Sequence, residues 1–237
     1  LFCLIITCLL LIPMEYISIS GQTKFSKNKK SKTKKSKGGL SAKEKKLLDD
    51  LDRELEENKP DKIYAFIGEK IEVKQFTPSL EKDEILMDSA FKAKYKIIQN
   101  VYGDYEDEFI EFEAYDHYGY PPFAKFKNVL LFVSEYKGKL YHEKYQYFDV
   151  YQTKNGSWAG CGDPYQFEEV HRKPVKTFVL DFIEPVSYDL SEFNAKQRKE
   201  FYPKPFYKIE GKKAICLRGA YIDELFLVKK NGVLKAR

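Results

Sequence analysis

The chain has 237 residues, of which 43% are hydrophobic and 32% are charged, and its formal net charge is +5. Eight lysines fall within residues 24–37 and one acidic residue, Glu15, precedes them, so residues 38–237 carry a net charge of −2. The basic charge therefore belongs to one short segment, which argues against a folded domain with a net basic charge.

Residues 1–22 have the pattern of an export signal. Residues 1–14 are almost entirely apolar, and Ser18, Ser20 and Gly21 supply the small side chains that a signal peptidase selects. The apolar run is shorter than the about 20 residues needed to span a bilayer, so we expect no transmembrane span. Cys8 is a candidate for lipid attachment, but the apolar run continues past it and favours a cleaved signal. We therefore predict a secreted, periplasmic or cell-envelope-associated protein.

Residues 23–40 are rich in lysine, serine, asparagine and threonine, with Phe25 as their only aromatic residue. Such a segment cannot bury enough apolar surface to offset its ordering entropy, so we predict a disordered tether. The lysines of residues 24–37 could also contact an anionic envelope surface, where each contributes about 1 kcal/mol. Nucleic-acid binding has the same charge pattern, but export argues against that partner.

Residues 41–59 predict an amphipathic helix. Ser41 and Glu44 have the spacing of a capping box, and Pro60 marks the end of the helix. The apolar face would consist of Leu47, Leu48, Leu51 and Leu55. Lysines near the start and acidic residues near the end oppose the helix dipole, so this helix should need a surface to dock on.

Residues 62–237 predict a single, mainly β domain with turns between short strands. The strand candidates are 63–67 and 71–76, separated by Gly68, and then 91–97, 109–115, 129–133 and 140–151. Alternation in 91–97 indicates a strand with one buried face, whereas the continuous apolar run 129–133 indicates a strand covered on both faces.

Tight turns are predicted at Gly103-Asp104, Lys137-Gly138, Asn155-Gly156 and Asn231-Gly232. The last of these turns should join strands at 225–229 and 233–235. One short helix is predicted at 190–201, beginning at Ser191 and ended by Pro203.

Four segments follow one another in an informative order: DSAFKAKY at 88–95, VYGD at 101–104, a strand at 109–116 and an apolar strand at 126–133. Together they resemble the netrin-like domain family, which includes the tissue inhibitors of metalloproteinases, over residues 85–161. The resemblance implies a five-stranded, OB-like Greek-key barrel. The Cys-x-Cys that inhibitors of this family use has no counterpart near the start of this domain, so protease inhibition is not implied. A generic antiparallel sandwich or open sheet is the alternative fold.

The sequence offers few groups for metal binding. His117, His142 and His171 are the only histidines, and their spacing does not match a zinc motif. We therefore predict no metal site and no cofactor.

Two cysteines, Cys161 and Cys216, remain once the signal is removed. An oxidising compartment would allow them to pair as a disulfide, and two independent thiols are the alternative. As a free thiol, Cys161 lies between two glycines and precedes His171, which is the residue order of papain-like cysteine hydrolases.

Aromatic residues provide the candidate binding site. Tyr118, Tyr120 and Phe123 lie in a loop that also contains Pro121-Pro122. Four further tyrosines would share one face of a regular strand: Tyr141, Tyr145, Tyr147 and Tyr151. If this face is exposed it offers a large contact area at low entropic cost, and if it points inward it is part of the core.

These features together predict an exported, non-catalytic binding domain. Its ligand would be a protein or a surface glycan that contacts the aromatic loop and the tyrosine stripe. A hydrolase that uses Cys161 and His171, or a structural component of the cell envelope, is the alternative.

Overall fold

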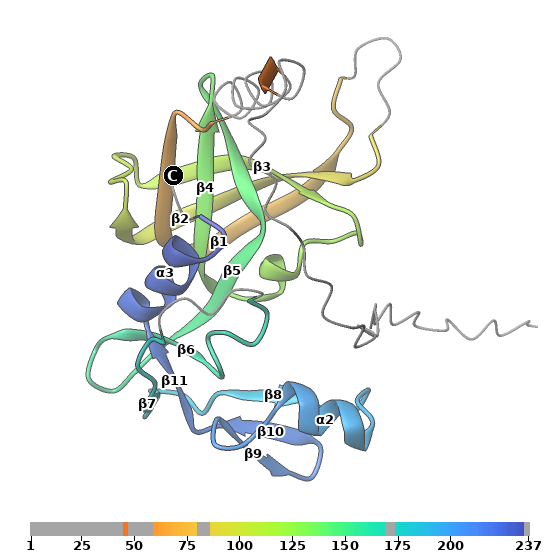
Figure 1. Ribbon diagram of the computed structural model, residues 1–237, viewed down its shortest axis with the longest axis vertical. Helices are drawn as coiled ribbons and strands as arrows, with labels where there is room; N and C mark the ends of the chain where they lie inside the picture. Colours follow the sequence, from red (N-terminus) through yellow and green to blue (C-terminus); the bar gives the residue numbers. More distant parts are fainter. Residues whose placement is uncertain (1–44, 47–58, 80–85, 169–173, 235–237) are drawn as a thin grey trace, which may run out of the picture. The chain divides into compact units, whose positions relative to one another are not determined.

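The computed structural model describes residues 45–46, 59–79, 86–168 and 174–234 (Figure 1). The chain divides into two compact units, Leu1–Leu47 and Leu48–Arg237. In the first unit only Lys45 and Lys46 are described, and both are helical. The predicted signal, the tether and most of the predicted helix at 41–59 thus lie outside the described residues. No helix in the described ranges is long and apolar enough to cross a membrane.

Five strands of the second unit close into a barrel. They are β1 (Lys62–Phe76), β2 (Ser89–Tyr102), β3 (Phe109–Asp116), β4 (Asn128–Tyr136) and β5 (Lys139–Gln152). β1 pairs antiparallel with β2 and β4, β2 pairs with β3, and β4 pairs with β5. A parallel pairing of Glu113 in β3 with Tyr141 in β5 closes the ring. This connectivity is that of an OB-like Greek-key barrel and confirms the predicted fold class.

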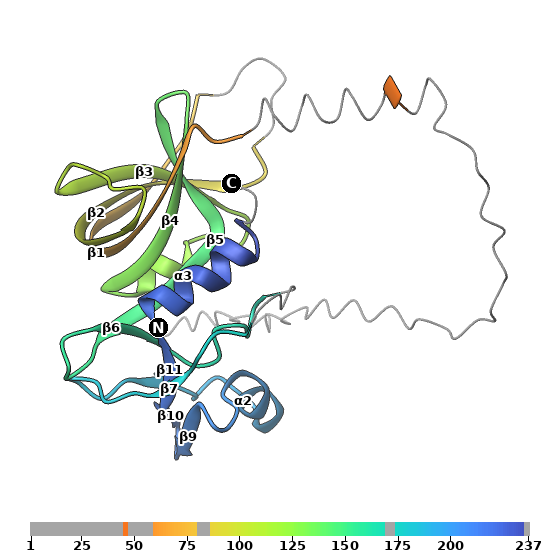
Figure 2. The same ribbon diagram turned by 60° about the vertical axis from the view of Figure 1, so that its left-hand side comes forward.

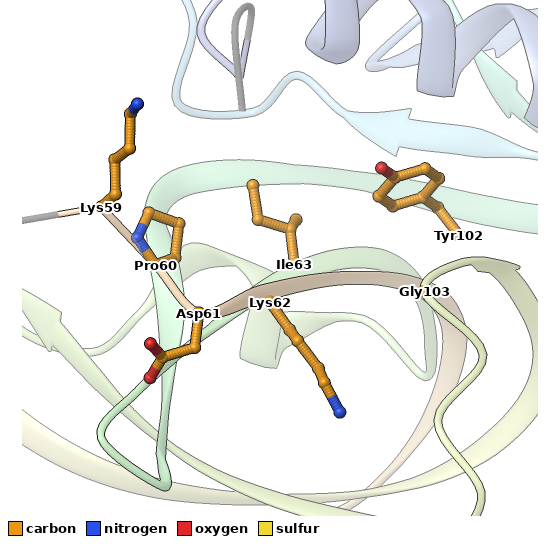
Figure 3. Close-up of a pocket in the computed structure, with 7 residues that line it drawn as sticks. All are labelled: Lys59, Pro60, Asp61, Lys62, Ile63, Tyr102 and Gly103. Carbon is orange, nitrogen blue, oxygen red and sulfur yellow. The ribbon is translucent and has the colours of Figure 1, made fainter. Parts of the chain in front are cut away.

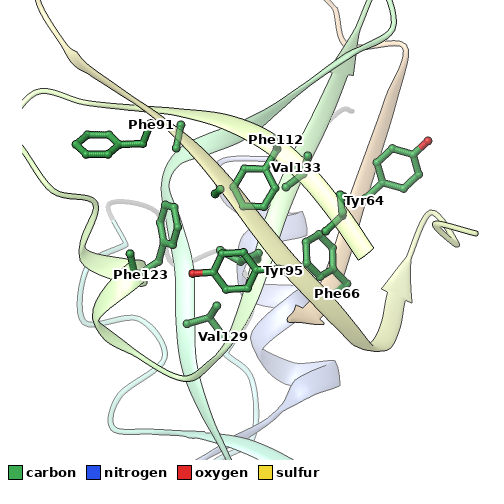
Figure 4. Close-up of a cluster of buried hydrophobic side chains, with 13 residues drawn as sticks. Tyr64, Phe66, Phe91, Tyr95, Phe112, Phe123, Val129 and Val133 are labelled. Atoms are coloured by element: carbon green, nitrogen blue, oxygen red, sulfur yellow. The ribbon is translucent and has the colours of Figure 1, made fainter. Parts of the chain in front are cut away.

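The barrel interior is filled by one face of each strand (Figure 4). In β2, Phe91, Ala93 and Tyr95 are buried there, while Lys94 lies on the outer face and pairs with Glu111 at 2.7 Å. This confirms the half-buried strand predicted from the alternation in 91–97. Each large apolar side chain buried in this way contributes about 1.5–3 kcal/mol, so the interior is the main source of barrel stability.

Strand β4 is covered on both faces, as its continuous apolar run predicts. Val129, Leu131 and Val133 belong to the barrel interior. Leu130 and Phe132 belong to a second cluster on the outside, which also contains residues of helix α3 (Ile222–Asn231). Figure 2 shows α3 against the outside of the barrel.

Helix α3 replaces the hairpin predicted at Asn231-Gly232. Ile222, Leu225 and Val228 recur at helical spacing, and all three are buried. Asn231 is the last helical residue and Gly232 is the C-cap, a position that favours glycine. The predicted strand at 225–229 is therefore wrong, because the helical period of the apolar residues outweighs the local turn signal.

Strand β1 runs through Gly68, where two separate strands were predicted. A shift in the pairing register with β2 occurs between Ile67 and Gly68. A Cβ atom on Gly68 would lie 2.9 Å from Cδ1 of Tyr95, so a larger residue would clash with the barrel interior. The glycine thus marks an irregularity within one strand and a close approach to a neighbouring ring, not a strand end.

The rest of the chain extends the barrel sheet and adds a second sheet (Figure 1). The extension contains β6 (Trp158–Cys161), β11 (Arg218–Tyr221) and β7 (Phe178–Val179). The second sheet contains β8 (Ser187–Asp189), β10 (Lys213–Cys216) and β9 (Tyr207–Glu210). The turn at Asn155-Gly156 joins β5 to β6, as predicted.

Helix α2 (Ala195–Phe201) is the predicted helix of this region, but it begins later than expected. Asn194 is its N-cap, and Asn194 and Gln197 form a capping box with both bonds at 3.0 Å. Ser191 instead donates a hydrogen bond to Asp189, the last residue of β8, at 2.7 Å. Both asparagine and serine make good N-caps, so the sequence left the first residue of the helix ambiguous.

Candidate binding surface

The predicted aromatic residues separate into exposed and buried groups. Tyr118 is 88% exposed, Tyr120 is 50% exposed and Tyr145 is 43% exposed. We call these three side chains, with the adjacent His117, the aromatic surface. Phe123 is only 1% exposed and packs in the barrel interior (Figure 4), because the short 3-10 helix η1 (Pro122–Lys125) turns it inward. The prediction that Phe123 contacts a ligand is therefore wrong.

Local hydrogen bonding and packing hold the loop of the aromatic surface. The buried carboxylate of Asp116 accepts a hydrogen bond from the backbone N–H of Tyr118 at 2.8 Å. Gly119 follows with φ +106°, a conformation that side chains other than glycine rarely adopt. The ring of Tyr120 packs edge-on against Phe91, with the ring centroids 5.7 Å apart. The loop therefore presents Tyr118 at its tip from a fixed base.

Tyr145 reaches the surface because β5 bulges. Leu131 in β4 lies opposite Tyr147, and Val133 lies opposite His142, so the β5 segment is longer than the β4 segment that it faces. Within the bulge, Tyr145 has φ +64°, which is uncommon for a residue other than glycine. Bulges of this kind redirect a side chain relative to the regular strand.

The side chain of His142 lies on the inner side of the bulge and contacts its backbone. Its Nε2 lies 2.9 Å from the carbonyl oxygen of Gln146, and the side-chain amide of Gln146 donates to the carbonyl oxygen of Lys144 at 3.0 Å. The imidazole packs against Phe123 at 4.5 Å and Phe112 at 6.1 Å between ring centroids. Burial lowers the pKa of His142 to about 4, so at neutral pH the ring is uncharged and donates through Nε2–H.

An ion pair lies next to the exposed rings. Lys144 Nζ is 2.5 Å from Oδ2 of Asp88, and His117 Nδ1 is 3.3 Å from Oδ1 of the same carboxylate. The hydrogen bond from Lys144 lowers the pKa of Asp88 below its usual value. The rings of Tyr118 and Tyr145 are 6.3 Å apart at an angle of 39°, and Lys144 Nζ lies 5.3 Å from the Tyr145 ring. The ion pair therefore joins the loop, the bulge and the residue that precedes β2.

The other predicted tyrosines of β5 do not form one exposed stripe. Tyr141 is half-buried beside Tyr115 of β3, at 6.4 Å between ring centroids. Tyr147 packs against the barrel interior, and Tyr151 packs against Phe182 in a separate cluster. The prediction assumed a regular strand, and the bulge breaks that regularity between Tyr141 and Tyr147.

Cys161 and Cys216 are joined by a disulfide, with their Cα atoms 6.0 Å apart and 55 positions apart in the sequence. A cysteine in a disulfide carries no thiolate and cannot act as a nucleophile. His171, the other residue of the alternative hydrolase site, lies outside the described residues. The arrangement therefore gives no support to the hydrolase alternative.

Asp149 of β5 makes a polar contact between the barrel and the second sheet. The hydroxyl of Tyr188 in β8 donates a hydrogen bond to its Oδ2 at 2.7 Å. Burial raises the pKa of Asp149, and hydrogen bonds from Tyr188 and Tyr151 oppose that shift. We interpret this group as a structural anchor, because its carboxylate is occupied by partners from the protein itself.

A pocket of about 580 Å³ lies at the start of β1 and the turn after β2 (Figure 3). Its lining residues are Lys59, Pro60, Asp61, Lys62, Ile63, Tyr102 and Gly103. The side chains of Lys59 and Lys62 point in different directions, and the Asp61 carboxylate accepts a hydrogen bond from the backbone of Lys137 at 2.7 Å. The sequence did not predict this pocket, and its charged groups do not converge on one point.

In the part of the chain that the structure describes, no group of three or more His, Cys, Asp and Glu side chains is arranged to hold a metal ion. A comparison with models of known protein families finds no match, and searches of curated proteins and of solved structures find none either. The netrin-like resemblance therefore stays a prediction.

Proposed function

We propose that the protein is an exported, non-catalytic binding domain that contacts a protein or a surface glycan through the aromatic surface. The observation that carries this proposal is the meeting of Tyr118 and Tyr145 at 6.3 Å, from a loop and a bulge that are distant in sequence. Exposed aromatic rings that gather in one place are typical of contact sites, because they bury large areas with few rotatable bonds.

Export has support from two independent features. The apolar run in residues 1–14 matches a signal sequence, and the Cys161–Cys216 disulfide suits an oxidising compartment. In this proposal the lysines of residues 24–37 provide a separate contact with anionic components of the cell envelope. The two contacts differ in chemistry, since the lysine contact should weaken with salt and the aromatic contact should not.

Retention of ligands from cell-surface extracts tests this proposal. The chain without residues 1–22 is immobilised, and the protein and polysaccharide fractions are applied to it separately. We expect a ligand that the wild type retains and that the double variant Tyr118→Ala/Tyr145→Ala loses. Tyr102→Ala is the matched control, because Tyr102 is 41% exposed but stacks on Phe226, away from the aromatic surface. Equal retention by all three proteins would overturn the proposal.

A further inference from the structure

We propose that the aromatic surface binds an uncharged oligosaccharide chain. The inference rests on the proposed binding function and names the class of its ligand. The rings of Tyr118 and Tyr145 would stack on the apolar faces of sugar rings. The Asp88 carboxylate would accept hydrogen bonds from the sugar hydroxyls, and the Lys144 ammonium would donate hydrogen bonds to them.

The geometry of the two rings suits the flat face of a sugar. Tyr118 and Tyr145 lie 6.3 Å apart at 39°, so they form a bent platform of two neighbouring rings. Tyr118 is 88% exposed, which leaves most of its ring free for contact. Sugars present an apolar C–H face surrounded by hydroxyl groups, and an aromatic ring with polar groups beside it matches both parts.

The position of the charged side chains favours a sugar over a protein partner. At the core of protein–protein interfaces charged residues are depleted, because burying them costs desolvation energy. Here Lys144 contacts both the Asp88 carboxylate, at 2.5 Å, and the ring of Tyr145, at 5.3 Å, so a charged pair lies directly beside the platform. A protein partner would have to dehydrate that pair. Sugar hydroxyls can instead replace its water molecules one by one.

The charges of the ion pair beside the rings balance. The one carboxylate of Asp88 and the one ammonium of Lys144 offset each other, so the platform has no excess of either sign from this pair. An uncharged chain therefore fits better than a polyanion. The basic residues of the chain are concentrated elsewhere, in residues 24–37.

Calorimetric titration with defined hexasaccharides tests the inference. The probes are cellohexaose, chitohexaose and maltohexaose, and the protein is the chain without residues 1–22. We expect at least one probe to bind, with an affinity that is unchanged between low and high salt. Tyr118→Ala/Tyr145→Ala should weaken that binding by about tenfold or more, which corresponds to a loss of at least about 1.4 kcal/mol in binding free energy. Tyr102→Ala should bind as the wild type does.

The outcomes separate this inference from the proposed function. If no probe binds at millimolar concentration but the extract experiment retains a protein through the same two tyrosines, the inference is wrong and the binding function stands. Binding of a probe that Tyr118→Ala/Tyr145→Ala leaves unchanged would contradict the inference, and equal retention of extract ligands by the wild type and that variant would contradict the proposed function as well. Thermal unfolding of each variant shows whether the substituted protein is still folded.

Discussion

The free energy of unfolding should fall on mild acidification because of one buried imidazole. His142 packs between Phe112 and Phe123, and burial lowers its pKa to about 4. In the unfolded chain the same group has a pKa of about 6.5. Between these two values the unfolded state binds one more proton than the folded state. Stability therefore decreases as the pH falls from about 6.5 to about 4, and the loss is complete below the lower value.

The magnitude follows from the two pKa values. The difference between a pKa of 6.5 and one of about 4 corresponds to about 3 kcal/mol of unfolding free energy, which is an upper bound because His142 keeps some solvent contact. Somewhat less than half of this change falls in an easily accessible range, since linkage gives a loss of about 1 kcal/mol between about pH 7.5 and 5.5. That loss is a sizeable fraction of the free energy of unfolding of a typical folded domain, which is about 5–15 kcal/mol.

Urea unfolding at several pH values measures this loss, with the fluorescence of Trp158, the only tryptophan, as the signal. The comparison is with His142→Gln, which can still donate to the carbonyl oxygen of Gln146 but does not titrate. All carboxylates are common to both proteins, so the difference between them isolates the imidazole. His117→Gln is the control, because His117 is half exposed. If wild type and His142→Gln lose stability in parallel between about pH 7.5 and 5, the imidazole is not buried as the structure describes.

Three further predictions concern stability, each measured by urea unfolding near neutral pH. Replacing Cys161 and Cys216 by alanine should lower the free energy of unfolding by about 4 kcal/mol, since the disulfide closes a loop whose ends are 55 positions apart. An unchanged urea midpoint would contradict a formed disulfide. Tyr95→Phe should raise the free energy of unfolding by about 1 kcal/mol, because the Tyr95 hydroxyl is buried without a hydrogen-bond partner among the described residues. A clear loss of stability would show that the hydroxyl has a hydrogen-bond partner. Lys229→Met should lower the free energy of unfolding by about 3 kcal/mol, because it leaves the Glu168 carboxylate buried and unpaired. Adding Glu168→Leu to this variant should restore most of the lost stability. No recovery in the double variant would show that the two side chains do not act as a pair.

The barrel could be predicted because its strands follow simple periods. Alternation in 91–97 gives one buried face, and the continuous run at 129–133 gives two. These periods arise from the pleat of the strand itself, so they are visible without knowledge of the partner strand. Closure of the barrel was expected only through the netrin-like resemblance, because the contact of Glu113 with Tyr141 leaves no local signal.

Where two local signals compete, the sequence did not decide between them. Asn231-Gly232 suits both a hairpin turn and the end of a helix. The burial of Ile222 and Leu225 against the outside of the barrel favours the helix, and this surface exists only after the strands have assembled. The ion pair of Asp88 with Lys144 was missed for a related reason, since its two residues are 56 positions apart and meet only in the folded barrel.

The aromatic surface depends on a departure from regular structure. In a regular β5, Tyr145 and Tyr147 would point to the same side, and Tyr147 packs against the barrel interior. The bulge, with Tyr145 at φ +64°, turns that ring outward beside Tyr118. His142 holds the bulge from the core, so the group that we expect to lower stability between about pH 6.5 and 4 also positions one half of the platform. If the aromatic surface binds a ligand as proposed, a variant that loosens this hydrogen bond should weaken that binding, although His142 itself is not part of the aromatic surface.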